Sequence, residues 1–376
     1  LYTSGQRIVL SYSVGKTDLL ESPWYVEAGK SQAFIRSLEI GPSQQTLRMA
    51  VADKASQVTA QGSSLAAVSK GADGFPLLIV APHEKTIRVK LLVTDKDVNA
   101  EGIQTLYKAS GAIENLGQMV KQDEGRWPEE LVTRGETTET GGPYVIDTLT
   151  LPFENPHKAL FFTAGHDFFS NGKGAICTAH GDVWVVAGID RHLKKIRWRR
   201  YATGLFQPLG LKILNDKVYV IGRDQITRLH DRNGDGEADY YENFNNDLFV
   251  SPRQHDYVTC LDTDPAGNFY FIHAKTGVMR ISADGSTMSA VGDGFRNPNG
   301  MTVGPQGTIT ASPQQGTWTP ESSIFVVKDG GYYGFGGPRV TKERPTGWDL
   351  PMCFVPRAMD NSGGGQVWVE SKRWGP

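Results

Sequence analysis

A short pattern recurs through the second half of this 376-residue chain. A turn ending in glycine or aspartate is followed by a short strand, usually with an aromatic residue at its third or fourth position. The pattern occurs at Gly181–Val186, Asp216–Ile221, Gly267–Ile272, Gly307–Ser312, which lacks the aromatic, and Gly365–Glu370. Four-stranded propeller blades repeat every ~40–50 residues, and loop insertions scatter that period. The pattern therefore predicts an all-β chain built around a β-propeller.

The composition agrees with many short strands joined by tight turns. The chain has 43 glycines, 20 prolines, 8 tryptophans and 13 tyrosines, and such residues are enriched in turns and strands. Helical periodicity is too scarce for an α/β fold. A β-sandwich, or a set of unrelated hairpins, remains the alternative to the propeller.

The pattern of the N-terminal region predicts an antiparallel sheet, which is either a separate module or part of the propeller. Apolar residues alternate in five short runs, at residues 7–14, 33–40, 46–52, 77–80 and 86–93. Residues 100–122 predict a linker with a short helix. Glu136–Pro143 is polar and ends in a Gly-Gly-Pro turn signal. We therefore predict an N-terminal β-rich region and linker over residues 1–140, and propeller blades over residues 141–376.

Charge and cysteine content exclude several classes of function. Lys and Arg total 39 and Asp and Glu total 41, a net charge of −2. This charge gives no field that would attract nucleic acid or an anionic membrane. No run approaches the ~18 consecutive apolar residues that a membrane span requires. The three cysteines are far apart in the sequence and lack metal or haem spacing.

One loop has the spacing of a calcium site. Oxygen side chains stand at loop positions 1, 3, 5, 9 and 12, with a carbonyl at position 7 and a glycine at position 6, the arrangement by which one loop wraps a hard cation. The predicted metal residues are Asp231, Asn233, Asp235, Glu237, Asp239 and Glu242. Residues 225–229 before the loop alternate as in a strand. The sequence therefore favours a structural ion over an EF-hand sensor; a solvated turn without metal is the alternative.

A second constellation carries a family resemblance. His255 opens a predicted strand, and Gly294–Gly300 reads G-x-R-N-P-x-G about forty residues later. With the Gly-Tyr-Tyr-Gly turn at residues 331–334, this resembles the pyrroloquinoline quinone-dependent glucose and sorbosone dehydrogenases. The resemblance implies about six four-stranded blades, either incomplete in this chain or completed by the N-terminal sheet, with His255 as the catalytic base. It also implies that Arg296 and Asn297 bind the quinone cofactor.

Two aromatic residues are candidates for substrate binding. Trp318 and Tyr333 could stack on the apolar C–H edges of a sugar ring. Packing in the core or in a loop is the alternative for both.

A narrower resemblance concerns residues 144–152, 177–184, 204–211 and 222–231. These segments are similar to large secreted proteins of planctomycetes and verrucomicrobia, in which such a propeller often precedes a c-type cytochrome. The resemblance implies a periplasmic or extracellular location, a carbohydrate substrate and a cytochrome c electron acceptor, including one on the same full-length chain. Two alternatives to a sugar dehydrogenase stay open: a non-catalytic carbohydrate-binding or scaffold propeller, and a propeller polysaccharide lyase or hydrolase.

Overall fold

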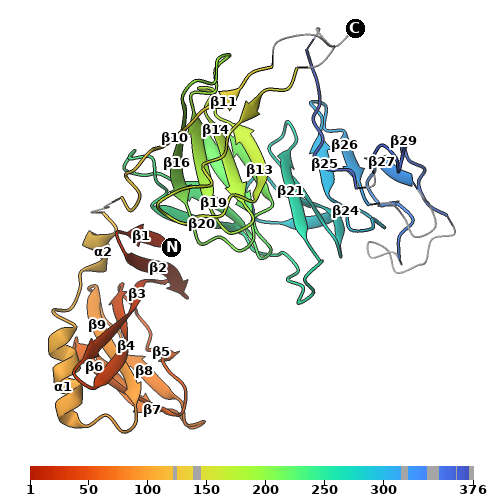
Figure 1. Cartoon of the computed structure of the whole chain (residues 1–376). Helices are drawn as coiled ribbons and strands as arrows, with labels where there is room; N and C mark the ends of the chain where they lie inside the picture. Colours follow the sequence, from red (N-terminus) through yellow and green to blue (C-terminus); the bar gives the residue numbers. More distant parts are fainter. Residues whose placement is uncertain (122–124, 139–144, 315–320, 337–346, 361, 372–376) are drawn as a thin grey trace. The chain divides into compact units, whose positions relative to one another are not determined.

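The chain divides into two compact units, which are described separately. The structure is a computed structural model that describes residues 1–121, 125–138, 145–314, 321–336, 347–360 and 362–371. The N-terminal unit is Leu1–Arg126 with Arg232–Asp235, and the C-terminal unit is Trp127–Asp231 with Gly236–Pro376 (Figure 1). The division precedes the predicted boundary at residues 140 and 141, because two short strands at residues 131–136 pair inside the C-terminal unit.

The N-terminal unit holds two antiparallel sheets. The larger has the order β1-β2-β3-β4-β9-β6, with β1 Tyr2–Ser4, β2 Arg7–Val14, β3 Thr17–Ala28, β4 Ser31–Ile40, β9 Ile87–Asp95 and β6 Ser56–Gly62. The smaller has the order β5-β8-β7, with β5 Leu47–Ala50, β8 Pro76–Val80 and β7 Ala66–Lys70. Apolar residues that alternate along these strands, such as Leu38, Leu91 and Leu78, share one buried core. The predicted N-terminal β-rich region is confirmed.

Two helices follow the last strand of this unit, α1 at Ala100–Ala109 and α2 at Leu116–Met119. Asn99 caps α1 by accepting a hydrogen bond from the Gly102 amide. At the other end of α1, the fully buried Lys90 ammonium donates to the carbonyls of Ser110, Gly111 and Ala112. A cation at a helix C-terminus is favourable because the last carbonyls there have no partner within the helix.

The C-terminal unit consists of successive antiparallel sheets, from β13 (yellow-green) to β29 (blue) in Figure 1. Sheet one contains β13 Thr163–Phe168, β14 Gly174–Thr178, β15 Val183–Ala187 and β16 Ile196–Ala202, with β10 Leu131–Thr133 at its edge. Sheet two contains β17 Gly210–Leu214, β18 Lys217–Ile221, β19 Ile226–His230 and β20 Tyr240–Asn245. Sheet three contains β21 Val258–Thr263, β22 Phe269–His273, β23 Gly277–Ile281 and β24 Met288–Asp293, with β28 Gly331–Tyr332 at its edge. Sheet four contains β25 Gly300–Val303, β26 Ile309–Ser312, β27 Glu321–Val327 and β29 Cys353–Pro356. A separate pair joins β11 Gly135–Glu136 to β12 Thr148–Leu149.

The four larger sheets are propeller blades. In each of them the strands pair in chain order, and the first strands of successive sheets are neighbours: β13 beside β17, β17 beside β21, and β21 beside β25. Up-and-down sheets whose first strands gather around one axis define a β-propeller. The predicted fold class is therefore confirmed, and the described residues contribute four blades.

Four of the five repeats found in the sequence lie on blade strands, namely β15, β18, β22 and β26. The strand predicted at Gly365–Glu370 is wrong, because this segment pairs with none of the sheets in the described residues. It instead runs alongside β25, with the Gly364 carbonyl against Gly300 and the Trp368 ring against Gly304. Residues 364–368 therefore follow β25 in the row of first strands without forming a ladder.

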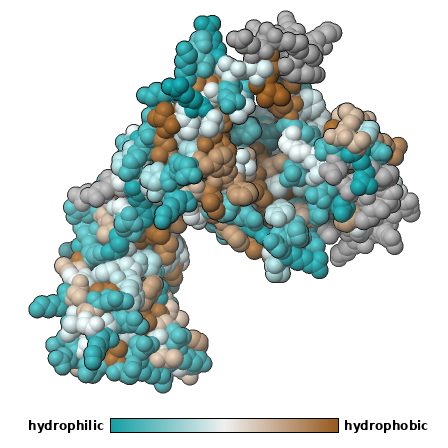
Figure 2. Space-filling model, viewed as in Figure 1, coloured by the Kyte–Doolittle hydropathy of each residue, from teal (hydrophilic) through white to brown (hydrophobic). Residues whose placement is uncertain are grey.

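Neither helix in the described residues is long and apolar enough to cross a membrane. Figure 2 shows apolar side chains in patches among hydrophilic ones. In the C-terminal unit the exposed large apolar residues include Phe153, Phe162, Phe168 and Phe206. Phe162 directly precedes β13, the first strand of sheet one, and Phe206 lies shortly before β17, the first strand of sheet two.

Candidate functional site

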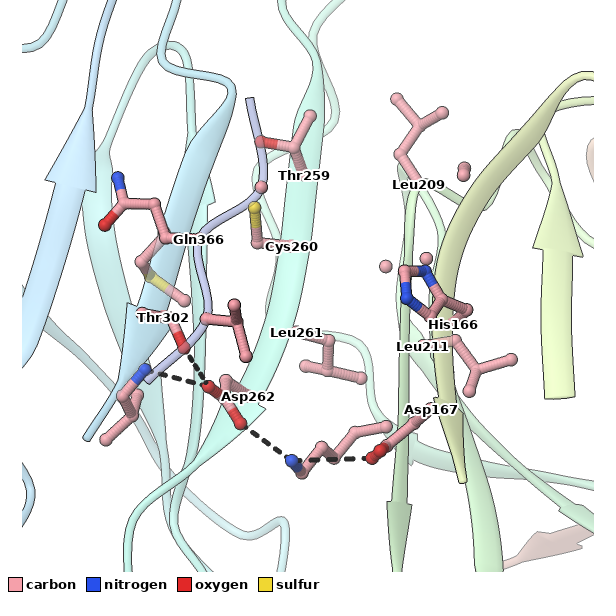
Figure 3. Close-up of a pocket in the computed structure, with 18 of the residues that line it drawn as sticks. His166, Asp167, Leu209, Leu211, Thr259, Cys260, Leu261, Asp262, Thr302 and Gln366 are labelled. Atoms are coloured by element: carbon pink, nitrogen blue, oxygen red, sulfur yellow. Dashed lines mark hydrogen bonds and ion pairs between the residues drawn. The ribbon is translucent and has the colours of Figure 1, made fainter. Parts of the chain in front are cut away.

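The four first strands line a cavity of about 960 Å³. Its walls come from residues 163–168, 209–212, 259–262 and 299–305, and residues 365–370 complete the lining on the β25 side. Figure 3 shows Leu209 and Thr259 toward one end of the close-up, and Asp167 and Asp262 toward the other. The cavity therefore follows the axis around which the blades are arranged.

The first strands run in the same direction. Thr259 contacts the Pro298 carbonyl and Asp262 contacts Thr302, so β21 and β25 advance together. Gly210 lies against Cys260, and two residues later Lys212 pairs with Asp262, so β17 and β21 also run in the same direction. The residues that enter these strands consequently lie at one end of the cavity, which we call the mouth.

Glycine permits the close approach of these strands. A Cβ atom on Gly210 would lie 2.5 Å from the Cys260 carbonyl carbon, and one on Gly300 would overlap the Gly364 carbonyl oxygen. Both glycines stand in the same local sequence, Pro-x-Gly followed by leucine or methionine. Any larger residue would push β17 away from β21 at Gly210, and would push residues 363 and 364 away from β25 at Gly300.

A belt of polar contacts crosses the first strands near the far end of the cavity. The Lys212 ammonium lies 2.9 Å from Asp262 and 3.4 Å from Asp167, as the dashed lines in Figure 3 show. Asp262 also accepts hydrogen bonds from the Thr302 hydroxyl and the Val303 amide. One lysine therefore links β13, β17 and β21, and Asp262 extends the link to β25.

Substituting Lys212 with methionine is expected to lower the free energy of unfolding of the C-terminal unit by about 2 kcal/mol, since two partly buried carboxylates lose their cation. Burial alone would lower the pKa of Lys212, but Asp262 and Asp167 outweigh it and raise that pKa. The stabilisation is therefore complete below the unfolded pKa of ~10.4 and is lost as pH rises through the folded value. Urea denaturation of Lys212→Met beside the exposed control Lys217→Met measures the effect; equal stability of the two would contradict it.

The loops entering the first strands are held at the mouth by one repeated hydrogen bond. In each of the four described blades, an amide in the turn after the second strand donates to the carbonyl of an entering residue. The four pairs are Ala179 to Phe162 at 2.8 Å, Arg223 to Phe206 at 3.0 Å, Ala274 to Tyr257 at 3.0 Å and Gln314 to Arg296 at 3.0 Å. Phe162, Phe206, Tyr257 and Arg296 are therefore equivalent positions on successive blades, and we call them the mouth residues.

His255 is exposed and lies two residues before the mouth residue Tyr257, with the two rings 6.1 Å apart and nearly perpendicular. Its loop is tightly held. The Arg223 guanidinium donates to the carbonyls of Ser251 at 3.3 Å and Arg253 at 2.7 Å, and to the Gln207 side chain at 3.2 Å. The buried Asp256 carboxylate accepts from the Ser251 hydroxyl and lies 3.6 Å from the Lys275 ammonium.

Asp256 is an anion beside this loop. Burial alone would raise the pKa of its carboxyl, but the Ser251 hydrogen bond and the Lys275 charge outweigh burial, and the pKa lies below its usual value. The Ser251 and Lys275 contacts of Asp256 therefore hold the backbone next to His255.

Arg296 and Asn297 enter β25 at the mouth. Arg296 is half-buried, whereas Asn297 is exposed and has a left-handed backbone with φ 38°. Gln207 holds the equivalent position before β17, also left-handed with φ 47°. Each precedes a proline, so the conformation belongs to the repeated entry into a blade.

The two predicted sugar-stacking residues do not reach the mouth in the described structure. Tyr333 is 3% exposed, stacks on Phe295 with ring centroids 4.6 Å apart, and accepts a hydrogen bond from the Lys328 amide. Its stacking role is wrong, because neighbouring core residues cover the ring. Trp318 lies outside the described residues.

Several of the predicted calcium residues have hydrogen-bond partners in or beside the loop. Asp231 accepts from the Gly236 amide, and Asn233 accepts from the Asp235 amide. Glu237 accepts from the Trp127 amide, and Glu242 pairs with Arg228 and His230 on β19. Asp239, the remaining predicted ligand, is buried.

The described residues contain no group of three or more His, Cys, Asp or Glu side chains that could hold a metal ion. Calcium binding at this loop remains a prediction from the sequence.

The unusually polar positions of Gln207 and Arg223 beside blade strands predict a place at the axial mouth, but the contacts of Arg223 give no local signal. Its carbonyl acceptors Ser251 and Arg253 lie about thirty residues further along the chain. The mouth residues were detectable, because Phe206-Gln-Pro-Leu-Gly-Leu211 and Arg296-Asn-Pro-Asn-Gly-Met301 are two copies of one pattern. Aligning these copies would have placed Phe206 and Arg296 at equivalent positions.

No family model matches the chain, and no curated protein matches its sequence. Among solved structures, it is similar to a putative oxidoreductase (glucose dehydrogenase) from Thermus thermophilus, with a TM-score of 0.41, 16% identity, and coverage of 52% of this chain and 70% of that one. It is also similar to the PQQ-bound aldose sugar dehydrogenase from Streptomyces coelicolor, with a TM-score of 0.42, 13% identity, and coverage of 63% and 75%. The PQQ domain of pyranose dehydrogenase from Coprinopsis cinerea is similar with a TM-score of 0.40 and 11% identity, and the match covers 54% of this chain and 61% of that one. Each similarity covers only part of this chain. The assignment of the propeller rests on the strand pairing described above.

Proposed function

We propose that the C-terminal unit oxidises an alcohol group of a carbohydrate, with pyrroloquinoline quinone as the electron acceptor. One observation carries the proposal: the loops with His255, and with Arg296 and Asn297, enter the neighbouring strands β21 and β25 at the same end of the axial cavity. A base and two nitrogen donors thereby belong to adjacent blades of one site.

The donor set suits a quinone chemically. A guanidinium and a carboxamide both offer N–H groups, and the quinone offers carbonyl and carboxylate oxygens that accept them. Arg296 also carries a positive charge, which favours an anionic cofactor and the charge gained on reduction. These residues therefore fit the cofactor that the sequence resemblance implies.

In the proposed reaction, the alcohol carbon loses a hydride and its hydroxyl loses a proton, which leaves a carbonyl. The quinone, when bound, would accept the hydride, which carries both electrons of the oxidation. The His255 imidazole takes the hydroxyl proton. Arg223 holds the His255 loop through its carbonyls, so that the base keeps one position at the mouth.

Equilibrium titration with pyrroloquinoline quinone, with and without calcium, tests the proposal, together with dye reduction on aldoses and oligosaccharides. Arg296→Ala is expected to weaken quinone binding about tenfold or more, the value of a charge-assisted hydrogen bond. Arg280→Ala is the matched control, since Arg280 is exposed on β23 at the opposite end of its blade. Saturable sugar binding without quinone binding would instead support the non-catalytic carbohydrate-binding propeller.

A further inference from the structure

We infer that the mouth residues Phe162, Phe206 and Tyr257 bind successive sugar rings, so that the substrate is an oligosaccharide longer than a single sugar. The inference rests on the proposed function for the reaction, and it adds the class of substrate. It assigns to these three residues the ring-binding role that Tyr333 cannot fill.

The repeated hydrogen bond carries the first step. Phe162, Phe206 and Tyr257 each present the carbonyl that accepts from the turn after the second strand, as Arg296 does in the fourth blade. Each stands one to three residues before the first cavity-lining residue of its own strand, namely Thr163, Leu209 and Thr259. Three aromatic residues and one arginine therefore hold equivalent backbone positions at the mouth.

Exposure carries the second step. Phe162 is 66% exposed and Phe206 is 54% exposed, although the backbone of both is held by the repeated hydrogen bond. Each ring is backed by a neighbour: His180 lies 5.2 Å from the Phe162 ring, and the Arg223 guanidinium lies 6.0 Å from the Phe206 ring. The rings are thus supported on one side and still accessible to water.

The chemistry of sugars suits such rings. A pyranose carries apolar C–H groups on its faces and hydroxyls around its edge. Stacking removes the C–H groups and the phenyl ring from water together, while the hydroxyls stay hydrated. Arginine, which can bind a carboxylate or quinone oxygen, stands only at the fourth of the equivalent positions.

The order of the mouth residues gives the direction of the chain. Tyr257 is two residues from His255 and is followed by Arg296 on the next blade, whereas Phe206 and Phe162 lie on the two preceding blades. The reacting sugar therefore lies at Tyr257, beside the base. The following units extend over Phe206 and Phe162.

Calorimetric titration of the full chain with glucose, cellotetraose and maltotetraose tests the inference without requiring any reaction. We expect at least one tetrasaccharide to bind about tenfold or more tightly than glucose. Phe206→Ala should weaken tetrasaccharide binding about tenfold, the value of one aromatic contact, and leave glucose binding unchanged. Phe206→Tyr keeps the ring and should bind within about threefold of the native protein.

Phe354→Ala is the matched control, because Phe354 is 49% exposed on β29, the outermost strand of sheet four, and does not line the cavity; its binding should not change. The inference is overturned if neither tetrasaccharide binds more tightly than glucose, or if Phe162→Ala and Phe206→Ala both bind as the native protein does. Ring-dependent tetrasaccharide binding in a protein that oxidises no sugar would support the inference and reject the proposed function. Sugar oxidation that is unaffected by Phe162→Ala and Phe206→Ala would support the proposed function and reject the inference.

Discussion

Replacing His255 with alanine is expected to lower kcat for sugar oxidation by about 10²-fold or more, the usual contribution of a positioned general base. The dissociation constant for pyrroloquinoline quinone should stay within about twofold of the native value, since Arg296 and Asn297, not His255, are the proposed cofactor contacts. Steady-state dye reduction at several pH values, with a parallel quinone titration, separates the two effects.

His192→Ala provides the control for this substitution. His192 is equally exposed but lies in the loop between β15 and β16, after the third strand of its blade. A native kcat is expected there. If His255→Ala kept kcat within threefold of the native protein, another group would have to accept the proton and the assignment of the base would be wrong.

Arg223→Ala is expected to lower kcat by about tenfold or more, although Arg223 is a positioning residue in this account. Its guanidinium binds the Ser251 and Arg253 carbonyls and the Gln207 side chain. Loss of these bonds frees the loop that carries His255, and a misplaced base loses the advantage of fixed geometry. Faster hydrogen exchange at residues 251–256 should accompany the lower kcat.

Two further variants separate positioning from general destabilisation. Arg223→Lys keeps the charge but not the forked donors, so it should recover only part of kcat. Lys212→Met should destabilise the blades without changing hydrogen exchange in the His255 loop. Equal kcat losses in Arg223→Ala and Lys212→Met, with no exchange difference at residues 251–256, would contradict a positioning role.

The propeller was predictable because its signal is local. Each blade strand begins at a turn and alternates along its own length, as at Asp216–Ile221 and Gly267–Ile272, so the sequence shows it without reference to other strands. Segment Gly365–Glu370 has the same local pattern and yet forms no ladder with the described strands. A strand requires a partner as well as a pattern.

The contacts of the site were less predictable because they depend on register. Arg228 and Glu242 lie directly opposite each other on β19 and β20, so the carboxylate expected to bind calcium meets a guanidinium. Tyr333 follows β28, which pairs with β24 and turns the ring against Phe295. Neither partner is visible from the loop sequence alone. Arg296 and His255, by contrast, lie in recognisable entry segments.

Anaerobic mixing of quinone-loaded protein with an oligosaccharide that it binds tests the central claim most directly. The absorbance spectrum reports the state of the quinone, and mass spectrometry reports the sugar. The account predicts one equivalent of reduced quinone per protein and a sugar product lighter by two hydrogen atoms, both lost in His255→Ala. An unchanged quinone spectrum with intact sugar would contradict it.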